Sequence, residues 1–325
     1  MRIVFVVNEQ REPSAEQTTT LLMEAAMHRG HAVFVCGVGD LTETERGELS
    51  ARGCAPERSS TLSLSEQLAT SGKTRQVLDH CDLCVVRTNP GRDEGRRTQH
   101  LAMLRMLERL DERGVRVINR PRGLSRALTK LSLLDLPPTL RPRTIVTRDS
   151  EEIAQFVRRQ PDRSVIKPLE GTRGRDVFVL GSRHSDVNSK QIIDAVLRQG
   201  YAVVQEFVAG AEDGDVRVTV VGGQILEVDG ALAAVARVPG RGDFRSNLHA
   251  GGAAAPASVT SEMDAAVQRI APLLEREGLF HVGVDFVGAR ILELNVFSPG
   301  GLFPAERLYA RDFAGAVIEA FERGG

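Results

Sequence analysis

Two hydrophobic patterns alternate along the first 118 residues. Short apolar runs are separated by longer amphipathic segments, in which apolar residues recur with a helical period. The short runs predict strands at Arg2–Val7, Ala32–Val38, Asp82–Thr88 and Val115–Ile118, and the longer segments predict helices at Glu16–Arg29 and Arg96–Arg113. Strands that alternate with amphipathic helices indicate a parallel α/β sheet. The first strand runs into NEQREPS and not into a Gly-rich dinucleotide-binding turn, which argues against NAD.

The pattern changes at Asn119-Arg120-Pro121, where proline disfavours helix in the preceding residue and marks a boundary. Beyond it we predict a helix at Gly123–Leu134 and a proline-rich linker at Leu136–Arg143. The later strands are predicted at Thr144–Thr147, Ser164–Lys167, Val177–Leu180 and Tyr201–Phe207, and the later helices at Ser150–Arg159, Gln191–Arg198, Ser261–Glu277 and Ala305–Arg323. Strands and turns fill the region up to residue 238, and a loop follows it.

The sequence between Gly278 and Leu302 predicts a β-hairpin with strands Val282–Val287 and Ile291–Val296. A three-residue loop, Gly288-Ala289-Arg290, places Asp285 opposite Glu293 and Gly283 opposite Asn295. One face then carries Asp285, Glu293 and Asn295, and the other face carries Val284, Phe286, Leu292 and Leu294. A two-residue loop would turn one strand over and separate the two carboxylates, so the cleaner sorting favours the longer loop.

The polar face of this hairpin predicts a cation site. Opposed side chains lie about 5 Å apart at Cβ, and two carboxylates that close repel unless a cation or a proton lies between them. Rigid oxygen ligands suit Mg²⁺ held together with substrate phosphates, and two Mg²⁺ ions about 4 Å apart would fit the same face. From the hairpin alone, a solvated polar face is an equally good interpretation.

Composition excludes several classes of protein. The 325 residues suffice for two or three domains. A net charge of -1 argues against a nucleic-acid surface built on bulk charge, and 4% aromatic residues do not favour base stacking. No apolar run approaches the roughly 20 residues of a membrane helix, and the N-terminus does not read as a signal peptide. We therefore expect a cytoplasmic protein with neither nucleic-acid nor membrane partners.

The cysteines are expected to be free thiols in the protein core. Cys81 and Cys84 form a lone C-x-x-C without a second pair, and Cys36 and Cys54 stand apart. We interpret them as core thiols and not as a zinc or redox site. A reducing cytosol is consistent with that interpretation.

Two lysines before the hairpin are candidates for contact with an anion. Lys167 ends the apolar strand SVIKP, where an unpaired charge would be costly and a phosphate would remove the cost. Lys130 alone reads more readily as a solvated helix residue. The loop after Glu170, with Gly171 and Gly174, could bring backbone N–H groups close to phosphate or simply turn the chain.

Several polar segments could line a ligand site, although each also has an ordinary structural interpretation. The strand end Gln205-Glu206-Phe207-Val208 could hold an adenine edge or be core strand. Asp215 and Arg217 share a strand face, as ligand contacts or as a surface ion pair. The segment 237–252 could hold phosphates or a carboxylate, or be a solvated loop. Ser298-Pro299-Gly300-Gly301 could offer N–H groups to an oxyanion or turn the chain.

Taken in order, these pieces resemble an ATP-grasp ligase, and most closely the bacterial glutathione synthetase family. The resemblance covers nearly the whole chain and rests on Lys130, IKPLEGTRG with Lys167, QEF, DGDVR, ARVPGRGDFRSNLHAGG, GLFHVGVDF and LELNVFSP. It implies an α/β fold in which an N-terminal parallel-sheet domain, 1–120, precedes a two-part ATP-grasp module. The central subdomain with the phosphate lid would span 121–200, and the C-terminal subdomain with the metal site would span 201–325.

The resemblance also implies roles for individual residues. ATP would be held by Lys130, Lys167, Gly171, Gly174, Gln205, Glu206, Phe207, Val208 and Asp215. Mg²⁺, with Mn²⁺ as an alternative metal, would be held by Asp285, Glu293 and Asn295. Catalysis would involve Arg217, Arg237, Arg245 and Asn247, and the substrates would contact Arg87, Ser298, Gly300 and Gly301. Arg87 would hold a substrate carboxylate.

The implied reaction joins a carboxylate to an amine. The γ-phosphoryl group of ATP moves to the carboxylate, and an amine attacks the resulting acyl phosphate, so that positioning and charge neutralisation carry the catalysis. In the family the small-molecule substrates are γ-glutamylcysteine and glycine, and the enzymes tend to form homo-oligomers. The chain departs from the family pattern at Arg173 and Arg175 in the glycine loop and at Phe297 and Gly300-Gly301 after the hairpin. A related amino-acid or peptide ligase therefore stays open, as does a non-catalytic ATP-binding module, against which the intact lysines and hairpin ligands argue.

Overall fold

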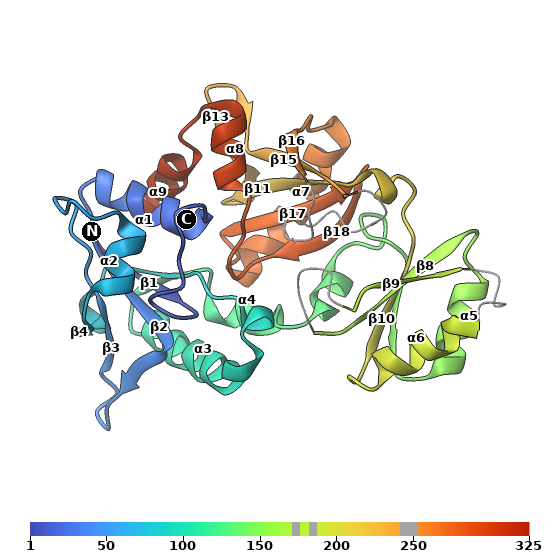
Figure 1. Cartoon of the computed structure of the whole chain (residues 1–325), viewed down its shortest axis with the longest axis horizontal. Helices are drawn as coiled ribbons and strands as arrows, with labels where there is room; N and C mark the ends of the chain where they lie inside the picture. The colour runs from blue at the N-terminus through green and yellow to red at the C-terminus, as the bar shows by residue number, and fades with distance from the viewer. Residues whose placement is uncertain (171–175, 182–186, 241–252, 325) are drawn as a thin grey trace.

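The computed structural model of the chain describes residues 1–170, 176–181, 187–240 and 253–324. Its larger sheets lie one after another along the long axis of the molecule (Figure 1). The N-terminal sheet lies at one end, the sheet built from residues 144–206 lies at the other end, and the sheet that carries the hairpin lies between them. The fold is therefore a mixed α/β fold with the hairpin at its centre.

The N-terminal sheet has the strand order β4-β3-β2-β1-β5-β6. Its strands are β1 (Arg2–Val7), β2 (Ala32–Glu43), β3 (Leu49–Cys54), β4 (Thr74–Val77), β5 (Leu83–Val86) and β6 (Arg116–Ile118). Around them lie the helices α1 (Thr18–His28), α2 (Leu64–Thr70) and α3 (Arg97–Glu112) and the 3₁₀ turns η1 (Leu78–His80), η2 (Pro90–Arg92) and η3 (Glu94–Arg96).

The sequence correctly predicts the parallel part of this sheet and misses its antiparallel edge. The β1–β2, β1–β5 and β5–β6 pairs are parallel, whereas β3 pairs antiparallel with β2 and with β4. The missed strands read LSARGC and TRQV, which have neither an apolar run nor a clean alternation. The sheet is therefore mixed and not purely parallel.

The central sheet is antiparallel, with the strand order β7-β10-β8-β9. Its strands are β7 (Thr144–Thr147), β8 (Arg163–Pro168), β9 (Phe178–Gly181) and β10 (Ala202–Glu206). The helices α5 (Ser150–Arg158) and α6 (Val187–Leu197) cover one face, where Ile153 and Val157 pack against Ile166 and Val204 of the strands. Because side chains alternate along a strand, the neighbour of Ile166, Lys167, lies on the opposite face.

The strand β10 pairs with β7 and β8, so it belongs to the central sheet although the expected break lies at residue 200. The first strand of the next sheet begins at Asp215. We therefore propose that the boundary between the two subdomains lies between residues 206 and 215.

The C-terminal sheet has the strand order β16-β15-β11-β17-β18, and β12 pairs with β11. Its strands are β11 (Asp215–Val221), β12 (Gln224–Ile225), β15 (Ala234–Val238), β16 (Ala253–Pro256), β17 (His281–Val287) and β18 (Arg290–Asn295), and a separate small pair is formed by β13 (Glu227–Val228) and β14 (Ala231–Leu232). A 3₁₀ turn, η5 (Ala211–Asp213), precedes the sheet, and the long helix α7 (Ser261–Glu277) has the bounds predicted from the sequence.

Two predicted helices are interrupted. The expected helix Gly123–Leu134 is split into α4 (Pro121–Arg126) and the 3₁₀ turn η4 (Lys130–Asp135), and the Thr129 side chain caps the second piece. The expected closing helix Ala305–Arg323 is split into α8 (Leu302–Tyr309) and α9 (Phe313–Arg323). Ala310 ends α8 in a left-handed conformation and the Asp312 side chain caps α9, so the chain turns between them.

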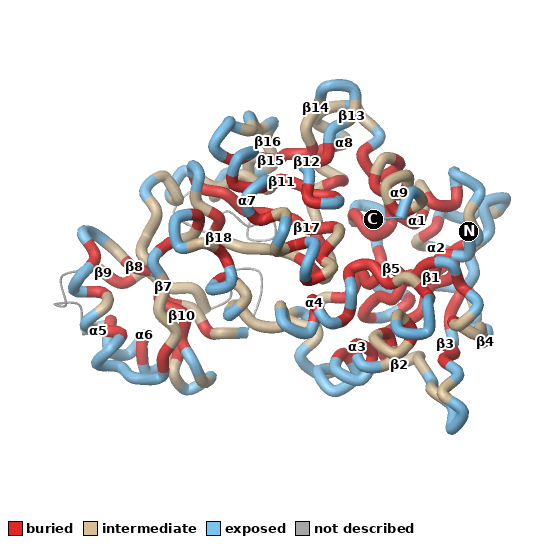
Figure 2. The backbone as a smooth tube through the Cα atoms, turned by 180° about the vertical axis from the view of Figure 1, so that it is seen from behind, coloured by how far each residue is buried: buried red, intermediate tan, exposed pale blue. Residues whose placement is uncertain are grey.

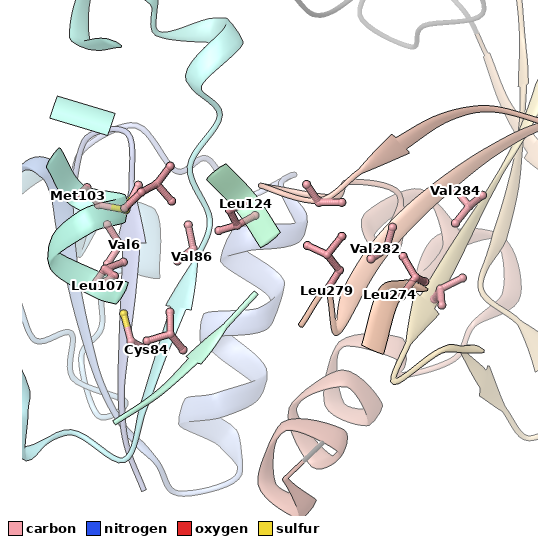
Figure 3. Close-up of a cluster of buried hydrophobic side chains, with 14 of the residues drawn as sticks. Val6, Cys84, Val86, Met103, Leu107, Leu124, Leu274, Leu279, Val282 and Val284 are labelled. Atoms are coloured by element: carbon pink, nitrogen blue, oxygen red, sulfur yellow. The ribbon is translucent and has the colours of Figure 1, made fainter. Parts of the chain in front are cut away.

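One hydrophobic core extends from the N-terminal sheet into the C-terminal sheet. Figure 3 shows Val6 and Met103 on the N-terminal side, Val282 and Val284 on the C-terminal side, and Leu124 of α4 between them. The central subdomain has a separate core of its own. The N-terminal domain and the C-terminal subdomain are thus packed as one body.

Burial follows these cores. In Figure 2 the buried backbone runs along β1, β5 and β17, and the outer faces of the helices are exposed. The four cysteines are buried and free, as expected of core thiols. Burial raises the pKa of Cys81 to about 12 and raises the pKa of Cys84 as well. Across the described ranges, no helix is both long and apolar enough to cross a membrane.

Candidate active site

The hairpin formed by β17 and β18 has the predicted opposition of polar residues. Asp285 lies opposite Glu293, and Gly283 lies opposite Asn295. The predicted loop is wrong, because Val287 pairs with Arg290 and only Gly288 and Ala289 form the turn. The sheet compensates with a bulge on β18, which restores the register before Glu293.

The bulge also corrects the apolar face of the hairpin. Phe286 lies opposite Ile291, and both side chains are fully buried in the core that also contains Val284. Leu292 is the extra residue of the bulge and lies outside that core, whereas Leu294 packs against it. Ile291 thus takes the place that the three-residue loop assigned to Leu292.

Asp285 is the centre of a buried network of charges. Arg217 donates to both carboxylate oxygens, with Nε–Oδ1 and Nη2–Oδ2 distances of 2.7 Å each. Arg237 Nη2 lies 2.8 Å from Asp285 Oδ2 and binds Asp215 through Nε and Nη2 at 2.5 and 2.6 Å. Arg237 is 5% exposed and Asp285 is 2% exposed. Sheet order explains the cluster, because β11 pairs with β15 on one side and with β17 on the other.

The network shifts the ionisation of its members toward their charged forms. Burial alone would raise the pKa of Asp285, but Arg217 and Arg237 lower it to about 2. Burial alone would lower the pKa of Arg237, but Asp285 and Asp215 raise it. Both groups are therefore charged at neutral pH.

A cavity of about 620 Å³ opens beside the hairpin. Three parts of the chain line it, namely the N-terminal domain, the segment around η4 and the central subdomain, together with the end of β18. Its polar and apolar lining includes Asn89, Arg97, His100, Leu128, Lys130, Glu170, Tyr201, Glu293, Asn295, Phe297 and Ser298. Glu293, Asn295 and Ser298 are the predicted site residues that reach this cavity from the hairpin and the turn after it.

The donors at the hairpin fit a hard cation that is shared with a phosphate ligand. Glu293 and Asn295 supply oxygen atoms at the cavity, and Mg²⁺ in proteins is often held by one or two carboxylates plus substrate phosphates. Asp285 lies behind them, and the Asn295 amide nitrogen donates to its Oδ2 at 3.2 Å. In the described ranges no group of three or more His, Cys, Asp or Glu side chains is placed to hold a metal ion.

Lys130 and Lys167 converge on Glu293 from different elements. Lys130 lines the cavity and donates from Nζ to the Pro168 carbonyl at 3.1 Å. Burial lowers its pKa to about 8, with Glu293 opposing and Lys167 adding to the shift. Burial also lowers the pKa of Lys167, and Glu293 again opposes the change. Glu170, which also lines the cavity, acts on Lys130 in the same sense as Glu293, so two lysines and two carboxylates meet at this wall.

The predicted adenine segment ends β10. The Gln205 side chain donates to Thr144 Oγ1 at 3.1 Å, and the Glu206 carboxylate accepts from the Nε of Arg143 at 2.7 Å. Burial would raise the pKa of Glu206, but hydrogen bonds from Arg143 outweigh it, so that the pKa is lowered. The guanidinium of Arg163 stacks 4.0 Å from the centre of the Phe207 ring. The side chains at 205–207 are thus engaged within the protein, and Val208 is half-buried beside them.

Arg87 is a buried arginine for which no carboxylate partner is found in the described residues. It is 5% exposed, and it donates to the Pro299 carbonyl at 2.9 Å and to Thr19 Oγ1 at 3.1 Å. Its Nη1 is buried without a hydrogen-bond partner among the described residues, and burial lowers its pKa to about 9. Arg87 follows β5, beside the end of β1, where the sheet order reverses and open α/β sheets commonly bind ligands.

The turn after the hairpin packs against the charge network. Gly301 has φ +121°, and a Cβ built on it would lie 3.3 Å from Cδ of Arg217. A Cβ built on Gly300 would have no atom of the other described residues within 4 Å. Gly301 therefore leaves room for Arg217.

Four predicted site residues, Gly171, Gly174, Arg245 and Asn247, lie outside the described residues. Sequence reasoning also missed residues that contact the site. Thr19 holds Arg87, and Asn119 bonds the backbone of the hairpin. The available signal was position, because Asn119 directly follows a buried strand and Thr19 lies in the first turn of α1.

Two family models match the chain. The model described as prokaryotic glutathione synthetase, N-terminal domain, matches residues 1–125, and the model described as prokaryotic glutathione synthetase, ATP-grasp domain, matches residues 129–310. A glutathione synthetase from Synechocystis sp. is 30% identical over 317 residues, or 95% of each chain. A glutathione synthetase from Parasynechococcus marenigrum is 33% identical over 323 residues, or 98% of each chain.

Solved structures with the same fold include two ligases. The ATP-grasp ligase PsnB complexed with minimal precursor is 21% identical with a TM-score of 0.62, and the match covers 98% of each chain. The D-cycloserine synthetase DcsG is 18% identical with a TM-score of 0.59, and the match covers 98% of this chain and 99% of that chain. At these identities the likeness shows the fold.

Proposed function

Because the chain belongs to the prokaryotic glutathione synthetase family and is thus an ATP-grasp ligase that forms a C–N bond, we propose that it joins γ-glutamylcysteine to glycine. The γ-phosphoryl group of ATP is transferred to the carboxylate of the cysteine residue in γ-glutamylcysteine, and ADP leaves. The glycine nitrogen then attacks the acyl phosphate carbon, the C–N bond forms, the C–O bond to phosphate breaks and the amine loses a proton. The products are glutathione, ADP and phosphate.

The observation that carries this proposal is the meeting of Lys130, Lys167, Glu293 and Asn295 from three separate elements. The lysines would neutralise the phosphates of ATP, as their positions beside Glu293 at the cavity suggest. We further propose that Gly171, Gly174, Gln205, Glu206, Phe207, Val208 and Asp215 contribute to the nucleotide site, on the strength of the family likeness. At 205–207 the contact would come from the backbone, because the side chains are engaged.

Glu293 and Asn295 would hold Mg²⁺, and Asp285 would join them when its arginine partners turn toward the substrates. The metal supplies charge neutralisation at the transferred phosphoryl group. Arg217 and Arg237 would stabilise the same group or the acyl substrate, and Arg245 and Asn247 would assist, as the family likeness suggests.

Arg87 would bind a carboxylate of the acyl donor. The supporting observation is its buried Nη1, which has no hydrogen-bond partner in the part of the chain that the structure describes, because a carboxylate would satisfy that donor and balance the buried charge. The turn with Ser298, Gly300 and Gly301 would border the same substrate, since the carbonyl of Pro299 accepts from Arg87. Mn²⁺ as an alternative metal, action in the cytoplasm and assembly into a homo-oligomer rest on the family likeness alone.

A second candidate function is the ligation of a different acyl donor by the same chemistry. It is favoured by Phe297, which lines the cavity and is one of the positions where the chain departs from the family pattern.

The test is release of ADP from Mg-ATP, γ-glutamylcysteine and glycine, with each component omitted in turn. We expect release to require all three substrates and glutathione to accumulate in equal amount. Nucleotide binding without release would reject this substrate pair, and the search would then move to other carboxylates and amines. Absence of nucleotide binding would reject the proposed ATP site itself.

A further inference from the structure

Asn119 is a buried amide at the junction of the N-terminal domain and the ATP-grasp module. It directly follows β6 and is 3% exposed. Its Nδ2 donates to the backbone carbonyls of His281 and Val296, at 2.8 and 2.6 Å. Its Oδ1 accepts from the backbone N–H of His281 at 2.8 Å. Both N–H donors of Nδ2 and one acceptor position of Oδ1 are thus directed at two backbone positions.

These two positions are the open end of the metal hairpin. His281 is the first residue of β17, and Val296 follows Asn295, the last residue of β18. The turn at Gly288 closes the other end. Asn119 therefore bridges the two strands where their own ladder begins and ends, one peptide from the proposed metal ligand Asn295.

The N-terminal domain is anchored to the same segment in other ways. The backbone N–H of Arg120 donates to the Gly278 carbonyl at 2.9 Å, just before β17. Arg87 donates to the Pro299 carbonyl, at the other side of Val296. The segment from Val296 to Pro299 is thus held at both ends by side chains of the N-terminal domain. The continuous core beneath it makes that domain a rigid support (Figure 3).

For metal binding, the precise placement of Asn295 matters more than the stability that the Asn119 hydrogen bonds add to the fold. Mg²⁺ demands near-ideal ligand geometry, and partners that orient a metal ligand commonly affect metal affinity. Asn295 is short and ends its strand, so the position of its amide follows the backbone at Val296. That backbone is fixed by the shortest of the Asn119 hydrogen bonds.

From this geometry we propose that Asn119 is a positioning residue, which holds the open end of the hairpin so that Asn295 and Glu293 bind the metal–nucleotide complex. The inference rests on the proposed function. Asn119, at the domain boundary, would thus affect the affinity for the metal through the backbone carbonyls of His281 and Val296.

The test compares two buried amides that undergo the same chemical change. Asn119→Asp keeps the shape and removes both donations to carbonyls. Gln10→Glu is the matched control, because Gln10 is fully buried and donates from Nε2 to the Leu68 carbonyl at 3.0 Å and to the Ser71 carbonyl at 3.5 Å, away from the hairpin. Asn119→Ala is the second variant, for the case in which the aspartate does not fold. Thermal midpoints and the Kd of ADP, with Mg²⁺ and with a chelator, are measured for each by calorimetry.

We expect the Asn119 variants and Gln10→Glu all to have a lower thermal midpoint than wild type, and none to change the Kd of ADP in the chelator. In the Asn119 variants the gain in ADP affinity on adding Mg²⁺ should fall by roughly ten-fold or more, whereas Gln10→Glu should keep it. An unchanged Mg²⁺-dependent gain in the folded Asn119 variants would overturn the inference and leave a structural link only. If the wild-type protein shows no Mg²⁺-dependent gain, the proposed metal site fails, and the inference fails with it.

Discussion

Asp285→Asn should destabilise the metal-free protein by about 3 kcal/mol, in the range for breaking a buried ion pair. The substitution keeps the size of the side chain and removes the charge that faces Arg217 and Arg237. Arg237 is 5% exposed, and among the described residues Asp215 would be its remaining counterion. Independently, the pKa of Asp285 falls from 3.8 to about 2 on folding, and at 1.4 kcal/mol per unit that difference is worth about 2 kcal/mol.

The pH dependence of this effect has a defined sign. A carboxylate whose pKa is lower in the folded state stabilises the fold above its unfolded pKa, and the contribution disappears as the pH falls through the folded pKa. The difference between wild type and Asp285→Asn should therefore be constant near neutrality and shrink from about pH 4 to about pH 2.

The assay is urea unfolding in a chelator, followed by circular dichroism. Asp162→Asn is the control, because Asp162 pairs with Arg163 while its own side chain is 70% exposed. Such a surface pair should contribute less than about 1 kcal/mol. A free-energy loss for Asp285→Asn no larger than that of the control would refute the reasoning about the buried network.

Three other substitutions test separate features. Burial holds the imidazole pKa of His281 well below 6.5, so the wild type should lose up to about 1.4 kcal/mol of stability for each unit that the pH falls below 6.5, and His281→Phe should lose less. The same difference in urea midpoint between variant and wild type at pH 7.5 and at pH 5.5 would contradict this. Glu293→Ala should fold and bind ADP in a chelator but lose turnover by roughly a hundred-fold or more, and unchanged turnover would show that the metal assignment is wrong. Tyr309→Phe should cost about 1–2 kcal/mol, because the hydroxyl donates to the Ala234 carbonyl at 2.9 Å and accepts from the Ala257 N–H at 2.8 Å; thermal unfolding measures the loss, and no loss would mean that these bonds contribute nothing.

The hairpin shows how far local sequence reasoning reaches. The opposition of Asp285 and Glu293 was predicted from alternation, and it is correct although the predicted loop is one residue too long. Burial of one face constrains the register more strongly than the turn does. A bulge absorbed the difference, and no local pattern distinguishes a bulged strand with a short turn from a regular strand with a longer one.

The charge network shows where that reasoning ends. Arg217 and Asp285 are directly paired across β11 and β17, yet they are 68 residues apart in the chain. The sequence places each on the polar face of its own strand, but the order of strands in the sheet is set by packing over the whole subdomain. The same is true of Asn119, whose partners His281 and Val296 lie more than 160 residues further along.

The central sheet can be regarded as an insertion into an otherwise continuous body. Among the described residues, the buried members of its core lie between Ile153 and Val204, and Ile145 packs against them, whereas the other cores combine the beginning and the end of the chain. The two crossings of the chain into and out of it lie side by side, because the Glu206 N–H donates to the Arg143 carbonyl at 3.0 Å and the Arg143 Nε binds the Glu206 carboxylate.

Away from these crossings, polar contacts also join the central body to the larger one, among them the Lys130 N–H to the Leu169 carbonyl at 3.1 Å and the Arg97–Glu170 ion pair. A swing about the crossings would have to break these contacts. The central sheet carries Lys167 and the larger body carries Glu293, so a swing would change their separation while leaving each side intact. The central sheet would also unfold as a unit of its own, with a free energy of unfolding below that of the rest of the chain. Amide hydrogen exchange would show this as a common exchange rate at β7, β8 and β10 that is faster than the rate at β1 and β17. Uniform protection across both bodies would show that they open together.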